Sequence, residues 1–187
     1  SNANGNDDSD VQPFTYRVGV LAGISTDNFW AFYGDQPSVW NSYMLGPTKA
    51  ALYSIDAATG TLQSELASEQ PAATFDDDVW RVRVQLRDDL YWSDGSRVTA
   101  DDVAFTFESV RALTLGGSWE ESYPTIVESV HADSPTELRF EFSTRPTLGV
   151  WPHAVGLAPI MSARYWGDLA SGSSAQDLYA MSGIEDP

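Results

Sequence analysis

The segment that most constrains this fold runs from Trp80 to Glu108 and joins a strand, a turn and a capped helix. In its first part apolar and polar residues alternate, which is the period-two pattern of a strand with one buried and one solvent-facing side. The apolar positions are Trp80, Val82, Val84 and Leu86. A Ser-Asp-Gly turn signal follows at residues 93–95. We therefore expect a strand over about residues 79–87 with those four side chains buried and Arg81 and Arg83 exposed.

The second part of the segment predicts a helix that begins directly after Thr99. Thr99 stands three residues before Asp102, an acidic variant of the capping box, and Val98 and Val103 occupy the two positions of a hydrophobic staple. The apolar positions that follow at helical spacing are Val103, Phe107 and Val110. We expect a helix of three to four turns over about residues 100–113 that closes near the glycines at 116–117.

The rest of the chain carries further hairpin and helix signals. Two hairpins are expected, at 51–65 and 126–142, and the second should turn Leu138, Phe140 and Phe142 inward. Residues 72–75 should pair with the strand at Trp80 across residues 76–78, which makes a third hairpin. Residues 14–20 should form a first strand, and residues 162–169 a short helix. Strands and helices mixed with antiparallel hairpins indicate the α+β (mixed α/β) class.

Charge and composition exclude several classes of function. The net charge is −17, from 27 acidic and ten basic residues, and a field of this sign repels nucleic acid and anionic membranes. Hydrophobic residues make up 42% of the chain, which favours a folded globule. The sequence contains no apolar run of about 18 residues, so no membrane span is predicted. Cysteine is absent, so a disulfide, a thiolate nucleophile and a cysteine metal site are excluded.

The central segment resembles a known family signature. The matching stretches are Leu-Arg-Asp-Asp at 86–89, Trp-Ser-Asp-Gly at 92–95, Thr-Ala-Asp-Asp-Val at 99–103 and Phe-Thr-Phe-Glu at 105–108. They are similar to the signature of the family 5 extracellular solute-binding proteins, the peptide-, nickel- and oligosaccharide-capturing subunits of ABC importers. Asp89 departs from that pattern, because the family usually has glycine there. With its weaker flanks, the resemblance covers about residues 14–166.

The resemblance implies a periplasmic-binding-protein-like type II fold, present in part. Residues 1–13 would be a tag-cleavage scar and a flexible tether, and residues 14–37 the first segment of the main lobe. Residues 38–165 would form the accessory domain of the N-terminal lobe, and residues 166–187 a truncated return toward the main lobe. Members of the family are longer and close two lobes on a ligand, so this chain is expected to be an N-terminal portion without the C-terminal lobe.

The same resemblance implies capture of a peptide or similar small polar solute, without chemistry, at the extracellular face of the cytoplasmic membrane or in the periplasm. The partners implied are the ligand, the ABC permease subunits and the missing C-terminal lobe. Nucleic acid is not expected, and membrane contact would come only through a lipid anchor outside this sequence. Three alternatives stay open: an oligosaccharide ligand, suggested by the tryptophans, a carbohydrate-active enzyme domain using clustered acids, and a sensory or adhesion module.

Two groups of residues are candidate ligand contacts. The residues after the first strand offer a hydroxyl, a carboxylate, an amide and two rings, and binding residues are common in such loops. They are Thr26, Asp27, Asn28, Phe29 and Trp30. Trp119 and Tyr123 follow the signature helix and form the second group. The alternative for the first group is a packed loop with an Asx turn, and for the second it is core packing.

Neither a metal site nor a catalytic site is expected. His131 and His153 are the only histidines, and they lie 22 residues apart without a ligand-type spacing. Acidic clusters stand at 76–78, 88–89, 101–102 and 120–121, but a turn or a helix N-terminus accounts for the first and third. No nucleophile elbow and no phosphate-binding loop is present. The prediction is therefore a binding protein without cofactor, metal or catalytic residues.

Overall fold

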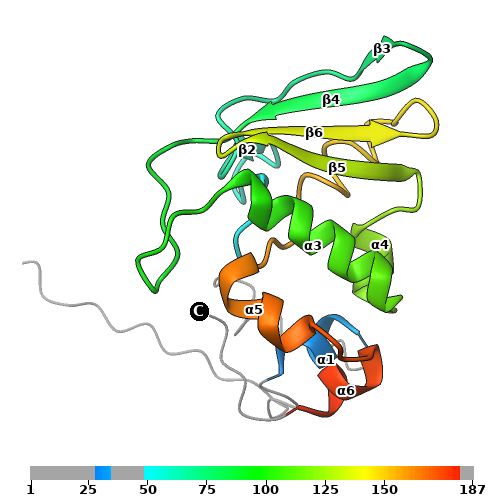
Figure 1. Cartoon of the computed structure of the whole chain (residues 1–187). Helices are drawn as coiled ribbons and strands as arrows, with labels where there is room; N and C mark the ends of the chain where they lie inside the picture. The colour runs from blue at the N-terminus through cyan, green and yellow to red at the C-terminus, as the bar shows by residue number, and fades with distance from the viewer. Residues whose placement is uncertain (1–27, 35–48, 182–187) are drawn as a thin grey trace, which may run out of the picture.

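The computed structural model describes residues 28–34 and 49–181 of the chain. Its elements are, in chain order, α1 (Phe29–Tyr33), β1 (Tyr53–Ile55), β2 (Leu62–Ser64), β3 (Thr74–Asp76), β4 (Val79–Gln85), α3 (Ala100–Leu113), α4 (Ser118–Ser122), β5 (Val127–Ser134), β6 (Glu137–Phe142), α5 (Ala163–Ala170) and α6 (Ala175–Ala180). The strands form a β1–β2 hairpin and a four-stranded antiparallel sheet of order β3-β4-β6-β5. Helix α3 packs against β5 and β6 on one side of this sheet (Figure 1).

Strand β4 follows the predicted alternation except near its start, where Trp80 and Arg81 depart from it, because the Arg81 side chain, expected to be exposed, is half-buried in ion pairs with Asp76 and Glu141. Val82, Val84 and Leu86 are buried, and β4 occupies the predicted position. Trp80 is only half-buried, so the expectation of four buried side chains is wrong at this position. The reason is that Trp80 lies beside the turn between β3 and β4, where its cross-strand neighbour Phe75 is itself 57% exposed.

Helix α3 begins and packs as the sequence predicts. Thr99 is the N-cap of a 14-residue helix and forms a capping box with Asp102. The predicted inward face is buried and consists of Val103, Phe107 and Val110. The helix ends through Thr114, which takes the left-handed conformation at φ 53°, and the glycines expected at its end instead precede the unpredicted helix α4.

The three hairpins predicted from local pattern are all present, and one further pairing completes the sheet. Strand β4 pairs with β6, with Val82 opposite Phe140 and Val84 opposite Leu138. As predicted, Leu138, Phe140 and Phe142 point into the core, where Phe140 contacts the Phe107 ring of α3 at a centroid distance of 5.3 Å. The sheet is thus buried on the α3 side and open on the other.

A second layer of short helices lies on the side of α3 away from the sheet (Figure 1). Helix α5, which begins within one residue of the predicted position, packs against α3, and α1 packs against α6. The first and last described elements therefore meet, far from the four-stranded sheet. The predicted division into main-lobe and accessory segments stays a prediction, and the strand expected at 14–20 lies outside the described residues.

Among the described helices, none combines the length and the apolar character that crossing a bilayer requires.

Candidate functional site

The side chain of Asn28, the first described residue of the first candidate group, makes hydrogen bonds to two helices. Its Oδ1 accepts hydrogen bonds from the backbone N–H of Trp30 at 2.9 Å and of Ala31 at 3.3 Å, which caps α1. Its Nδ2 donates to the carbonyl oxygens of Leu178 and Met181, both at 2.7 Å. The buried amide therefore starts one helix and holds the end of another, 150 residues later in the chain.

The two candidate groups meet in one aromatic cluster, formed by Phe29, Trp30, Trp119 and Trp166. Trp30 stacks on Trp119 at 5.6 Å and meets Trp166 edge-on at 5.4 Å, while Phe29 contacts Trp119 at 5.2 Å. The Trp119 indole N–H donates to the carbonyl oxygen of Trp30 at 3.2 Å. Within the described part of the chain, the indole N–H groups of Trp30 and Trp166 have no acceptor. Buried rings in these geometries stabilise the junction of α1, α4 and α5.

Burial decides what these side chains touch. Asn28, Phe29, Trp30 and Trp119 are at most 2% exposed, so they contact protein and not solvent in this structure. Tyr123 is 9% exposed, and its hydroxyl donates to the carbonyl oxygen of Pro159. Their role as ligand contacts stays a prediction. Thr26 and Asp27 lie outside the described residues.

The sequence interpretation assigned no role to α5 or α6 at this junction. Trp166 of α5 and Leu178 of α6 are fully buried there. A signal for α6 was present, because Ser174 and Asp177 form a capping box that the three-residue spacing could have revealed. No local pattern shows that Trp166 packs on Trp30, since that contact joins segments 136 residues apart.

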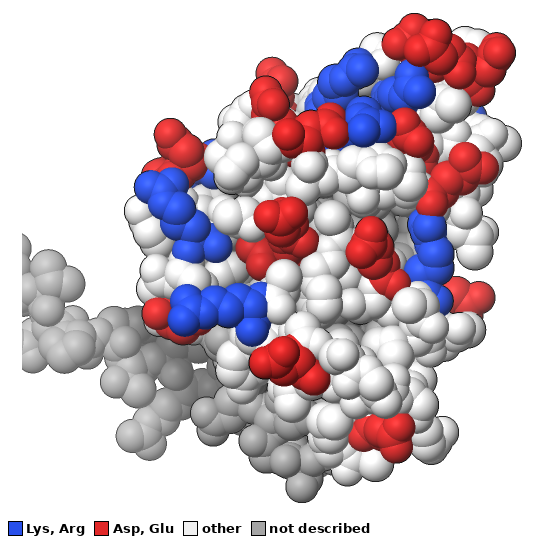
Figure 2. Space-filling model, viewed as in Figure 1, with Lys and Arg blue, Asp and Glu red and all other residues white. Residues whose placement is uncertain are grey.

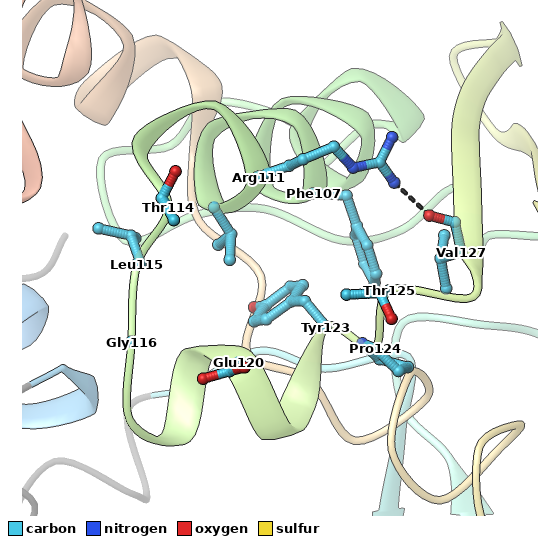
Figure 3. Close-up of a pocket in the computed structure, with 11 residues that line it drawn as sticks. Phe107, Arg111, Thr114, Leu115, Gly116, Glu120, Tyr123, Pro124, Thr125 and Val127 are labelled. Carbon is cyan, nitrogen blue, oxygen red and sulfur yellow. Dashed lines mark hydrogen bonds between the residues drawn. The ribbon is translucent and has the colours of Figure 1, made fainter.

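Tyr123 also lines a pocket of about 250 Å³ between the end of α3, α4 and the start of β5 (Figure 3). Its other lining residues include Phe107 and Leu115 from the core and Arg111 and Glu120 at the rim. The Arg111 guanidinium donates to the carbonyl oxygens of Val127 and Glu128. This pocket lies beside the aromatic cluster and was not predicted as a site.

The open face of the sheet is a network of paired charges. Arg81 donates to Glu141 at 3.0 Å, and Arg139 bridges Glu141 at 2.6 Å and Asp133 at 3.1 Å. The hydrogen bond from Arg81 is the main cause that lowers the pKa of Glu141, and the hydrogen bond from Arg139 lowers the pKa of Asp133. Figure 2 shows acidic and basic side chains close together at the top of the molecule, where the sheet lies. These carboxylates are held ionised as members of ion pairs.

The described residues contain no group of three or more histidines and carboxylates that could hold a metal ion. His131 and His153 are both exposed, and the His131 Nε2 lies 4.0 Å from a carboxylate oxygen of Glu141. Of the predicted acidic clusters, only Asp102 is buried. Its oxygens accept hydrogen bonds from the N–H groups of Thr99, Trp92 and Ala163. That carboxylate is occupied in joining α3 to α5.

Comparison with known proteins identifies a family that matches most of the described residues. Residues 61–179 match the family described as bacterial extracellular solute-binding proteins, family 5 Middle. A curated relative, "Probable peptide-binding protein YejA" of Agrobacterium fabrum, is 26% identical over 105 residues, which are 56% of this chain and 16% of the relative. The chain thus spans about one sixth of that relative's length.

Two solved structures show the same fold. The oligopeptide-binding protein AppA of Bacillus subtilis, in complex with a nonapeptide, has a TM-score of 0.54 and 20% identity over 65% of this chain and 23% of its own. The mannohexaose-bound periplasmic oligopeptide-binding protein of Thermotoga maritima has a TM-score of 0.53 and 23% identity over 70% of this chain and 22% of its own.

The mixed fold therefore matches part of the type II periplasmic-binding-protein fold. The matched residues cover more than half of the sequence, and the chain belongs to family 5 of the bacterial extracellular solute-binding proteins. By that description, members of the family are extracellular proteins that bind solutes.

Proposed function

We propose that this chain is part of the substrate-binding component of an ABC importer and serves the capture of a peptide or similar small polar solute. The observation that carries the proposal is the family match over residues 61–179, which includes the capped helix α3 and the sheet that packs on it. The partners are the permease subunits of the importer. The place of action is the outer face of the cytoplasmic membrane or the periplasm, with a lipid anchor as the link to the membrane.

A peptide ligand is supported by the names of two relatives, a probable peptide-binding protein and a structure with a nonapeptide. An oligosaccharide ligand is the second candidate, because the similar Thermotoga protein was solved with mannohexaose. Both ligands suit a cleft between two lobes, which would close by population shift when ligand bridges them.

The contact between α1 and α6 supports two different roles within the first candidate group, one for residues that hold the structure and one for residues that contact the ligand. Asn28 ties the start of α1 to the end of α6, and Trp30 anchors α1 in the aromatic cluster. We propose that these residues, with Phe29 and Trp119, position the residues that precede α1, and that Thr26 and Asp27 among these contact the ligand. On this view residues 14–37 and 166–187 belong to the main lobe and residues 38–165 to the accessory domain.

The proposal includes binding without catalysis. A general acid needs a pKa near the working pH, whereas paired hydroxyl or arginine donors lower the pKa of Asp89, Asp94, Asp133 and Glu141. The buried carboxylate of Asp102 faces three N–H donors of the protein itself. These arrangements support a structural role for the clustered acids.

Calorimetry on the complete protein tests the proposal with a peptide pool and with mannohexaose as titrants. Binding of peptides, with a loss of at least about tenfold in Asp27→Ala, is expected if the loop contacts the ligand. Asp77→Ala, which removes an exposed carboxylate of the β3–β4 turn, is the matched control and should bind as the parent does. Binding of mannohexaose alone would favour the second candidate. Hydrolysis of either titrant, or a larger effect of Asp77→Ala than of Asp27→Ala, would refute the proposal.

A further inference from the structure

A groove of about 580 Å³ lies between two loops beside the edge strand β3. One wall is formed by residues 70–73, which lead into β3, and the other by residues 145–148 and 151–152, which follow β6. The buried Trp151 belongs to the second wall, and its indole N–H donates to the carbonyl oxygen of Pro71 in the first wall at 2.9 Å. A hydrogen bond therefore joins the walls, and the volume suits one small molecule, since such sites measure roughly 300–1,000 Å³.

Most of the surface of this groove is apolar. Prolines and alanines contribute to both its walls, and Leu148, at 80% exposed, is the most exposed of the large hydrophobic residues that the structure describes. Among the described residues that line the groove, none is acidic. A ligand that covers Leu148 removes apolar surface from water, so the groove favours an apolar chain.

Arg145 is the charged residue of the groove, and it is exposed. Its guanidinium lies 5.3 Å from the centroid of the half-buried Trp80 ring, and it makes no hydrogen bond or ion pair with the described residues. By contrast, Arg81 and Arg139 are both held in ion pairs. The five N–H groups of the Arg145 guanidinium are therefore free for an anionic ligand.

The net charge of −17 opposes the approach of an anion, but distance limits that effect. At an ionic strength of 0.1 M, charges more than about 10 Å away are largely screened. The groups nearest to the ligand therefore decide its binding, and in this groove they are one guanidinium and apolar side chains.

We propose that this groove binds the anion of a medium-chain fatty acid, with about eight carbon atoms. Its carboxylate pairs with Arg145, and its unbranched chain lies against Leu148 and the prolines of the two walls. The ligand carries one charge because the groove offers one opposite charge. This site does not depend on which solute the complete protein captures.

An NMR titration of the 187-residue chain with octanoate tests the site. We expect saturable shifts of Ala73, Leu148 and the Trp151 indole N–H, with a Kd of about 1 mM, typical of so small a ligand. Octan-1-ol has the same chain without the charge and should bind about fivefold more weakly, as expected for the loss of an exposed ion pair. Hexanoate keeps the charge but lacks two methylene groups, and it should bind at least about threefold more weakly. N-acetylleucine, which imitates the carboxyl end of a peptide, should also bind more weakly than octanoate.

Arg145→Gln separates the charge from the apolar contact. It should weaken octanoate binding about fivefold and leave octan-1-ol binding unchanged. Arg83→Gln, which replaces another exposed arginine outside the groove, is the matched control and should bind octanoate as the parent does.

Leu148→Ser tests the apolar wall and should weaken the binding of both octanoate and octan-1-ol at least about threefold. Ile55→Ser, which replaces a 50% exposed side chain outside the groove, is its control. All four replaced side chains are exposed, and far-ultraviolet circular dichroism confirms that each variant is folded.

Four results would overturn the proposal: no shift of the groove residues with octanoate, equal binding of octanoate and octan-1-ol, tighter binding of N-acetylleucine than of octanoate, or parental octanoate binding in Arg145→Gln.

Discussion

A buried carboxylate is costly unless donors surround it, and the Asp102 carboxylate accepts hydrogen bonds from three N–H groups. It is 4% exposed, and its oxygens lie 2.8 Å from the backbone nitrogens of Thr99 and Ala163 and 3.2 Å from the Trp92 indole nitrogen. One residue thus caps α3 and holds the start of α5 against it. The sequence predicted the capping role, and the structure adds the other two contacts.

Asp102→Asn should lower the free energy of unfolding by about 3 kcal/mol, because the amide group cannot accept all three hydrogen bonds and leaves a buried donor unpaired. Urea denaturation measures the change. Asp101→Asn, in the same helical turn but exposed, is the control and should change the free energy of unfolding by less than about 1 kcal/mol. Equal losses in the two variants would contradict the role assigned to Asp102.

The aromatic cluster offers a second comparison between single residues. The Trp119 indole donates to the Trp30 carbonyl, whereas the Trp166 indole finds no acceptor among the described residues, and both side chains are fully buried. Replacement by phenylalanine removes a similar volume at each site, so the difference reports the hydrogen bond. Trp119→Phe should therefore cost about 1 kcal/mol more than Trp166→Phe in thermal or urea unfolding. A larger loss of stability in Trp166→Phe than in Trp119→Phe would contradict the hydrogen bond assigned to the Trp119 indole.

The ion pairs on the open face of the sheet make the stability of the fold depend on pH. The partners described above lower the folded-state pKa of Glu141 and Asp133 below their ordinary values of 4.5 and 3.8. A carboxylate with a lowered folded pKa stabilises the fold above its unfolded pKa, and that contribution is lost as the pH falls through the folded pKa. The free energy of unfolding should therefore fall from about pH 4.5 downward.

Arg139→Gln removes a partner from both carboxylates, so its free energy of unfolding should fall less steeply below pH 4.5 than that of the parent. Urea denaturation at a series of pH values measures the slope. Arg145→Gln, an exposed arginine that contributes to neither pKa shift, is the control and should keep the parent slope. Burial raises the pKa of Glu65, which acts in the opposite direction, but Glu65 is unchanged in all three proteins. Identical slopes in all three would show that these ion pairs contribute nothing measurable.

At the scale of the whole molecule, Asn28 joins the first described helix to the last. Asn28→Asp keeps an acceptor for the α1 cap but places a carboxylate against the carbonyl oxygens of Leu178 and Met181. Local opening of α1 should become easier by about 3 kcal/mol, or roughly 100-fold in amide exchange rate. Hydrogen exchange should show this loss at α1 and α6 while β4 and β6 keep their protection. Uniform loss across the sheet would mean that the junction and the sheet unfold together.

The sequence by itself determined the elements whose cause is local. The alternation from residue 80 to 86 predicted β4, the Thr99–Asp102 spacing predicted the start of α3, and turn residues predicted three hairpins, because neighbouring residues alone set these patterns. The same segment carried the resemblance to the family that the comparison confirms. Of the candidate site, the sequence supplied the residue types but not their surroundings.

Tertiary structure alone decided what those residues face. Trp80 was expected in the core, but the sheet ends beside it and leaves its ring half-exposed. Trp30 and Trp119 stand 89 residues apart and meet only because α1 packs on α4, and Arg111 and Glu120 share a pocket only because the chain turns at Thr114. Periodicity reports which side of an element is apolar, but the partner that covers that side lies far along the chain, so burial and site geometry arise only when the elements pack.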